Sequence, residues 1–240
     1  MSENVRRGYF DSDEKDFNEK NLEKLRKAQK DFYYLMNQNY PMQSIATFVG
    51  NHFAFSERQR MALIRATSSS ESIKIRSEKE IKKLGENETV YIDGFNVIIT
   101  LEVALSNSTL LHCMDNTIRD LAGLRGTYRL IDKTPIAIDM IGKKLSEMKI
   151  KKCVFYLDKP VSNSGRLKAK IFEVLEKYNF EVEVQIVLDA DQALVNLENV
   201  ISSDAMVIEH SSSWINFVKN IFDESEKKFP FYDFTMKEKV

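Results

Sequence analysis

Aspartates follow four predicted strands, and they are the side chains of this sequence best suited to chemistry. Apolar runs at residues 90–92, 154–157, 184–188 and 200–201 are each followed by aspartate within three residues. In an open parallel sheet, ligands bind at the carboxyl ends of the strands. Carboxylates gathered there repel each other unless a cation lies among them. Because Mg²⁺ binds one or two carboxylates together with substrate phosphate, the pattern predicts metal-assisted phosphate chemistry.

The residues expected at this edge divide into carboxylates and the polar side chains beside them. The predicted metal ligands and catalytic carboxylates are Asp93, Asp158, Asp191 and Asp204. Asp191 is preferred to Asp189 because it stands at the start of a predicted helix, which it would cap in the structural alternative. Asn96 would orient a ligand, or cap the helix after Asp93. Ser202 and Ser203 would orient water or ligands, although Ser-Ser-Asp is also ordinary helix-cap chemistry.

Basic residues that could contact a polyanion are Arg125, Arg129, Arg166 and Lys168. The last two follow a loop, residues 159–165, with hydroxyls, a glycine and a helix N-terminus, which together suit phosphate binding. It is not a P-loop, because the Gly-x4-Gly-Lys spacing is absent. Each of these cations taken singly is also typical of a solvated surface charge.

Composition excludes several classes of protein. Of the 240 residues, 43% are apolar and 30% charged, and Gly and Pro are scarce at 8 and 4, which argues against long disordered regions. Two cysteines without a Cys/His cluster exclude a disulfide framework and disfavour structural zinc. The sequence shows no signal peptide and no apolar run of membrane-spanning length, so a cytoplasmic location without membrane association is expected.

Periodicity predicts two domains, at residues 1–82 and 83–240. The first is expected to be all-helical, with a helix over 18–37, a short helix over 43–49 and another helix capped by Ser56 and Gln59. The last two could form a helix-turn-helix or a plain helical hairpin. Residues 67–72 are the predicted linker. The first domain carries 15 basic and 12 acidic residues, and the second carries 20 basic and 24 acidic residues. The small positive balance of the first domain is compatible with a nucleic-acid partner but does not require one.

The second domain alternates short apolar runs with helical patterns, which predicts a parallel α/β sheet. Strands are expected at 89–92, 152–157, 180–188 and 199–202, and helices at 97–121, with Asn107-Ser108 as a candidate break, and at 134–149, 164–178 and 213–222. The second of these helices would have Thr134 as N-cap and Pro135 at its first position.

These motifs resemble the acidic pattern of PIN-like nucleases, and their NYN branch most of all. The resemblance covers residues 88–210 and lies in Asp93-Gly94-Phe95-Asn96 together with Asp158, Asp191 and Ser202-Ser203-Asp204. It implies a three-layer α/β/α fold and a metal-dependent ribonuclease or flap-type nuclease. It also places the four aspartates at the family's acidic positions. Met206 departs from the pattern, because a further acidic residue usually stands there. The full chain also resembles a two-domain family known as domain of unknown function 434, through residues 33–41 and 57–60.

Three functions follow as expectations. The first is a Mg²⁺- or Mn²⁺-dependent nuclease that acts on RNA in preference to DNA. The second is a non-catalytic nucleic-acid-binding regulator with a degenerate PIN-like domain, which Met206 favours. The third is a phosphohydrolase for small phosphate esters, which the absence of an Asp-x-Asp nucleophile after the first strand disfavours. The sequence leaves open whether the protein forms a homo-oligomer.

Overall fold

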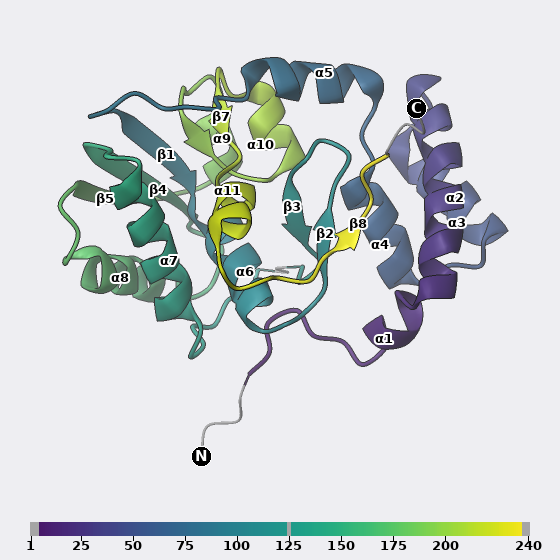
Figure 1. Ribbon diagram of the computed structural model, residues 1–240, viewed down its shortest axis with the longest axis horizontal. Coiled ribbons are helices and arrows are strands. Elements are labelled where there is room, and N and C mark those ends of the chain that lie inside the picture. Colours follow the sequence, from purple (N-terminus) through teal and green to yellow (C-terminus); the bar gives the residue numbers. More distant parts are fainter. Residues whose placement is uncertain (1–4, 124–125, 237–240) are drawn as a thin grey trace.

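A parallel five-stranded sheet forms the centre of the larger region (Figure 1). The computed structural model describes residues 5–123 and 126–236. The strand order is β5-β4-β1-β6-β7. The strands are β1 (Thr89–Asp93), β4 (Lys152–Asp158), β5 (Glu181–Val187), β6 (Val200–Ile201) and β7 (Trp214–Ile215). The predicted parallel α/β sheet is therefore confirmed, with its first four strands close to the expected positions.

Helices cover both faces of this sheet. One face packs against α6 (Gly94–Leu105), α7 (Thr134–Glu147), α8 (Ser164–Leu175) and α11 (Phe217–Glu224), and the other against α9 (Ala190–Leu194) and α10 (Ala205–His210). Side chains alternate along β4, so that Phe155 and Leu157 enter the first core while Val154 and Tyr156 enter the second. The three-layer arrangement expected from the sequence is confirmed.

The described residues before the sheet form an all-helical region, as expected, but in five helices where three were predicted. They are α1 (Asp13–Asp16), α2 (Glu19–Asn37), α3 (Met42–His52), α4 (Glu57–Ala66) and α5 (Ser70–Lys79). Asn18 caps α2, and Ser56 and Gln59 form the predicted capping box of α4. None of the helices in the described part of the chain is both long and apolar enough to cross a membrane.

The α3–α4 pair is a hairpin packed on the rest of the protein. In α4, Arg58 and Gln59 are buried. Arg58 binds Asp13 through Nε and Oδ1 at 2.7 Å and donates to the Leu121 carbonyl at 2.5 Å. Arg58 therefore ties α4 to α1 and to the segment that follows β3.

The predicted linker is wrong, because residues 67–72 belong to packed structure. Thr67 and Ser68 are buried, and the Ser69 hydroxyl accepts the Ser72 amide to cap α5. Ser-rich sequence here serves a helix start rather than a flexible connection.

The helix predicted over 97–121 ends close to the candidate break at Asn107-Ser108 and does not resume after it. α6 stops at Leu105, and the chain then forms an antiparallel pair, β2 (Leu110–His112) with β3 (Ile118–Asp120). Asparagines at 107 and 116 adopt positive φ, at 49° and 62°, where the chain leaves the helix and turns between the strands. β8 (Tyr232–Asp233) completes this small sheet in the order β3-β2-β8. The small sheet lies between the central sheet and the helical region (Figure 1).

Two other helix starts differ from expectation. Thr134 is the first residue of α7 rather than its cap, and its Oγ1 accepts the Ile131 amide at 2.9 Å. The helix expected from 213 begins at Phe217, because Trp214 and Ile215 form edge strand β7. The buried Trp214 indole donates to the Arg76 carbonyl at 2.7 Å, which ties the end of α5 to this strand.

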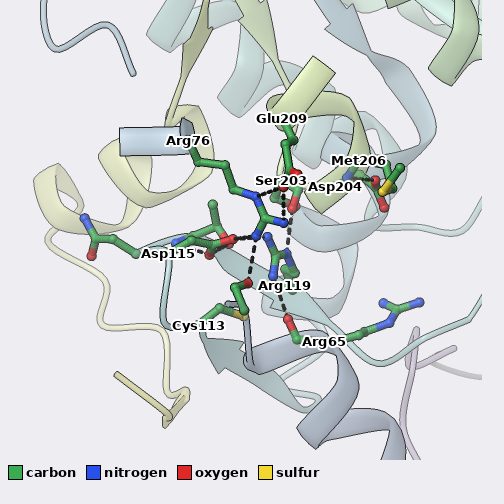
Figure 2. Close-up of polar contacts among 12 residues, drawn as sticks. Arg65, Arg76, Cys113, Asp115, Arg119, Ser203, Asp204, Met206 and Glu209 are labelled. Carbon is green, nitrogen blue, oxygen red and sulfur yellow. Dashed lines mark hydrogen bonds and ion pairs between the residues drawn. The ribbon is translucent and has the colours of Figure 1, made fainter. Parts of the chain in front are cut away.

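A buried cluster of ion pairs joins the helices to both sheets (Figure 2). Asp115, in the β2–β3 turn, binds Arg76 of α5 at 2.6 Å and also pairs with Arg119 of β3. Arg76 reaches Glu209 of α10 at 2.7 Å. Burial alone would raise the pKa of Asp115, but the charges of Arg119 and Arg76 outweigh it and hold that pKa below its usual range. Asp115 is therefore ionised and shared by two arginines.

Replacing Asp115 by Asn should lower the free energy of unfolding by about 3–5 kcal/mol, because two buried guanidinium groups lose their shared counter-charge. Urea unfolding followed by circular dichroism would measure it. Lys74→Ala breaks the exposed Lys74–Glu78 pair and is the control, with an expected change within about 0.5 kcal/mol. Equal effects of the two substitutions would contradict the role of the cluster.

Candidate functional site

Sheet order brings three acidic strand ends to one edge. β1 lies between β4 and β6, and Ile92 is in register with Phe155 on one side and Ile201 on the other. Asp93 is the last residue of β1, Asp158 the last of β4, and residues 202–204 follow β6 directly. Because the three strands are parallel, these residues meet at the same edge.

Asp93 is the buried member of the edge, with 5% of its surface exposed. Its Oδ2 accepts the Ser202 hydroxyl at 2.9 Å, and its Oδ1 accepts the Asn96 amide at 3.3 Å, which caps α6. Loss of water around the carboxyl raises its pKa to about 7, with the charges of Asp191 and Asp204 adding to the rise and the Ser202 hydrogen bond opposing it. Asp93 is therefore both a helix cap and a carboxyl poised between its protonated and ionised forms near neutral pH.

Gly94 allows α6 to start directly over β4. A Cβ at this position would lie 2.6 Å from Leu157 Cδ2 and 3.0 Å from the Tyr156 carbonyl oxygen. Any side chain would push the first turn of α6 away from the sheet, and with it the amide that holds Asp93. Glycine is therefore needed here for the close approach of α6 to β4.

Asn96 fastens the loop after β6 to α6. Its Oδ1 accepts the Ser203 amide at 2.9 Å and the Ser203 hydroxyl at 3.0 Å. Asn96 does not cap α6, since Asp93 does. Ser202 in turn accepts the Asp204 amide at 3.0 Å, so that the two serines and Asn96 fix the position of the last strand end.

Asp204 and Asp158 each bind backbone at the start of a helix. Asp204 caps α10, accepting the Met206 amide at 2.8 Å. Asp158 accepts the Ala190 amide at 2.8 Å, which ties the end of β4 to α9. Both side chains remain partly exposed, so each can still reach solvent at the edge.

Asp191 is not the cap of α9. Asp189 is, because its Oδ1 accepts the Gln192 amide at 3.0 Å, whereas Asp191 lies within the first turn with its side chain exposed. The pKa of Asp191 is raised to about 6, mainly because its carboxylate is partly shielded from water. The negative charges of Asp204, Asp158 and Asp189 add to the rise. The predicted capping role of Asp191 is therefore wrong, because Asp189 caps α9.

The four predicted aspartates influence each other electrostatically, but they do not form a closed cage. The pKa of Asp93 responds to Asp191 and Asp204, and that of Asp191 to Asp204 and Asp158. Across residues 5–123 and 126–236, no three His, Cys, Asp or Glu side chains form a group that could hold a metal ion. The hydrogen bonds to backbone amides direct part of each carboxylate of Asp93, Asp158 and Asp204 toward its own loop.

The predicted polyanion contacts are scattered. Arg125 lies outside the described residues, and Arg129 and Arg166 are exposed. Lys168 donates to the Val184 carbonyl at 2.8 Å and so supports the α8–β5 contact. Sequence reasoning missed Arg119, whose Nε donates to the Ser203 carbonyl at 2.6 Å beside the acidic edge. Only the pairing of β2 with β3, which was predicted as helix, could have placed it there.

Comparison with known proteins identifies the family. Residues 82–220, more than half of the chain, match the model described as "Domain of unknown function (DUF5616)". The chain belongs to the DUF5616 family. Residues 24–79 of this DUF5616 protein match "Protein of unknown function (DUF434)", which confirms the expected two-part family. The PIN-like resemblance has no counterpart in these matches.

One curated relative of this DUF5616 protein comes from Methanocaldococcus jannaschii and is described as "Uncharacterized protein MJ0935". The two are 36% identical over 203 residues, which cover 84% of this chain and 96% of the relative. No solved structure matches the chain. The shared length shows that both the helical region and the sheet region occur together in this relative.

Ionised Asp93 should destabilise the fold. The carboxyl has a pKa near 3.8 when unperturbed and about 7 in the folded protein, so the native state holds a proton that the unfolded chain has lost. The free energy of unfolding should therefore fall with rising pH between these values, by up to about 1.4 kcal/mol per pH unit in metal-free buffer.

Urea unfolding of the DUF5616 protein across this pH range, with Asp93→Asn alongside, measures the effect. Asparagine keeps an acceptor for Ser202 but does not titrate. The difference in stability between the variant and the native protein should grow in favour of the variant as pH rises. Parallel pH profiles would contradict the raised pKa.

Proposed function

We propose that the protein is a metal-dependent nuclease that hydrolyses phosphodiester bonds, with RNA as the favoured substrate. The supporting observation is the buried Asp93 carboxyl at the carboxyl end of the central strand, raised in pKa and under the charge of Asp191 and Asp204. Such a cluster is unfavourable by itself and is relieved by a cation. The cytoplasm is the expected location.

The donor set fits Mg²⁺ or Mn²⁺. All the side chains concerned are carboxylates, which hard divalent cations prefer, and Mg²⁺ needs only one or two of them, with water and phosphate oxygens completing its octahedron. Asp93 and Asp204 would bind directly, with Asp158 and Asp191 in support. The bound cation would polarise the scissile phosphate and lower the pKa of a coordinated water.

The remaining residues position these groups. The Ser202 hydroxyl donates to Asp93 Oδ2 and so sets the direction of the carboxylate. Asn96 holds Ser203 and thereby the loop that carries Asp204. Arg129, Arg166 and Lys168, with Arg125, would hold the nucleic-acid backbone, which implies salt-sensitive binding with little sequence preference.

A non-catalytic nucleic-acid-binding regulator is the second candidate. Two observations favour it: the described residues contain no group of three potential ligands, and Met206, 60% exposed, occupies the place of a further acidic residue. In that case the edge would keep its fold, because its polar bonds cap helices, but it would bind metal weakly.

Calorimetric titration of Mn²⁺, followed by cleavage assays on labelled single-stranded RNA and DNA, separates the two candidates. For a nuclease we expect binding that Asp93→Asn abolishes. Cleavage should fall about 100-fold or more in Asp93→Asn and Asp204→Asn, because several kcal/mol of charge stabilisation are lost. Asparagine also caps helices well, so α10 should persist in the second variant.

The matched control is Asp189→Asn, which removes a neighbouring carboxylate while keeping the cap of α9. It should retain Mn²⁺ binding and cleavage. Full activity of both Asp93→Asn and Asp204→Asn would overturn the assignment. Nucleic-acid binding without Mn²⁺ binding or turnover would select the regulator.

A further inference from the structure

A cleft of about 450 Å³ separates the helical region from the acidic edge. Met36 of α2, Met42 of α3 and Ile64 of α4 line it on the helical side. Asn96, Asp204 and Met206 line it on the side of the sheet. Of the proposed catalytic carboxylates, Asp204 lines the cleft, and parts of α2–α4 form its far side.

We infer that this cleft binds a nucleotide of single-stranded nucleic acid, with the base between Met36 and Met42 on the helical side and Met206 on the side of the sheet, and a phosphate between Arg65 and the acidic edge. The choice of ligand class rests on the proposed nuclease function. The inference goes beyond it by giving the helical region a share in substrate binding and by restricting the substrate to unpaired strands.

The methionine side chains on the two sides of the cleft suit the flat faces of a base. Met42 is 43% exposed and Met206 60% exposed, so both thioethers can be reached by a ligand, and they approach the cleft from opposite regions of the chain. Methionine is flexible and polarisable, and it packs well on aromatic rings of different shapes. A wall of this kind binds bases without selecting among them, which agrees with a sequence-tolerant nuclease.

Arg65 lines the cleft and has N–H donors that could bind a phosphate. Its Nη1 donates to the Asp120 carbonyl at 2.6 Å and lies 3.7 Å from the Asp120 carboxylate. Its Nε and Nη2 make no hydrogen bond to any residue that the structure describes. Figure 2 shows the Arg65 side chain extending away from the ion-pair cluster. Arg76 and Arg119, which also line the cleft, are already paired with Asp115.

A buried polar atom in the wall also lacks a partner. Thr67 lines the cleft at the end of α4, and its Oγ1 makes no hydrogen bond within the described part of the chain. Buried hydroxyls are usually satisfied. Among the described residues that line the cleft, this is the buried side-chain polar atom left without a partner.

Size and rigidity restrict the ligand to an unpaired strand. The volume lies within the roughly 300–1,000 Å³ typical of small-molecule pockets, which suits one or two nucleotides and not a duplex. The two walls are joined by Arg76 to Glu209 at 2.7 Å and by Arg119 to Ser203 at 2.6 Å. The cleft therefore cannot widen here without breaking a part-buried ion pair and a buried hydrogen bond.

Fluorescence anisotropy with a short fluorescein-labelled oligouridine, in EDTA to prevent cleavage, tests the inference. Met42→Glu should weaken binding about tenfold, since it places a charge on the wall that a base would cover. Gln43→Glu is the matched control, because it adds the same charge to the neighbouring exposed position of α3, outside the cleft. It should leave binding nearly unchanged.

A second pair of variants tests the phosphate contact. Arg65→Gln should weaken binding and flatten its dependence on salt, whereas Arg26→Gln removes an equal charge from the exposed surface of α2 and should do neither. Competition with uridine monophosphate tests whether one nucleotide is enough for binding. Displacement of the labelled oligouridine by the monophosphate supports a single-nucleotide site. Oligodeoxyuridine distinguishes RNA from DNA, and duplex RNA should bind at least tenfold more weakly.

The outcomes separate this inference from the nuclease assignment. If Met42→Glu and Gln43→Glu bind oligouridine equally well and cleavage persists, the cleft is not the binding site, and the nuclease assignment stands. Binding that depends on Met42 and Arg65, without Mn²⁺-dependent cleavage, overturns the nuclease and leaves the cleft. Absence of binding in the native protein, or duplex binding as tight as single-strand binding, also overturns the inference.

Discussion

The buried carboxylate of Asp115 is the interaction on which the arrangement of the molecule depends. It lies between Arg76 of α5 and Arg119 of β3, and those two arginines continue to Glu209 in α10 and to the carbonyl of Ser203. One chain of polar contacts thus runs from the helical region, through the small sheet, to the loop that carries Asp204. Buried ion pairs add little net stability compared with apolar packing, but they penalise every arrangement that leaves a charge unpaired. They fix how the parts sit against one another.

In the described part of the chain, by contrast, the carboxylates of the acidic edge lie close together without arginine partners of the kind that Asp115 has. Asp93 is buried among like charges, and its polar partners stabilise the ionised form only in part. The fold tolerates this because Asp93, Asp158 and Asp204 also bind backbone at helix starts. The same side chains therefore serve two purposes: they end strands and begin helices, and they leave an unbalanced negative potential at one edge. Helix capping explains why such a cluster can persist without a cation.

Local signals in the sequence predicted the parts of the fold that local chemistry determines. The capping box of Ser56 and Gln59, the strand ending at Asp93 and the parallel alternation that follows are all present. Residues 110–120 were predicted as part of a helix, but β2 pairs with β3 and also with β8, more than a hundred residues later, and helical periodicity does not report strand pairing. The cluster around Asp115 was missed for the same reason: its members are brought together by tertiary contacts that no spacing encodes.

The small sheet β3-β2-β8 connects the two segments that the DUF434 and DUF5616 models match separately. Leu111 and Leu121 of the β2–β3 segment, and Phe234 near the end of the chain, enter the same core as Leu25 and Phe32 of α2. Gln29 of α2 also donates to the Phe234 carbonyl at 2.8 Å. The sequence boundary between residues 79 and 82 therefore crosses no gap in packing. The helical region completes its interior with residues of the β2–β3 segment and of the far end of the chain, so the part matched by the DUF434 model does not contain its whole core.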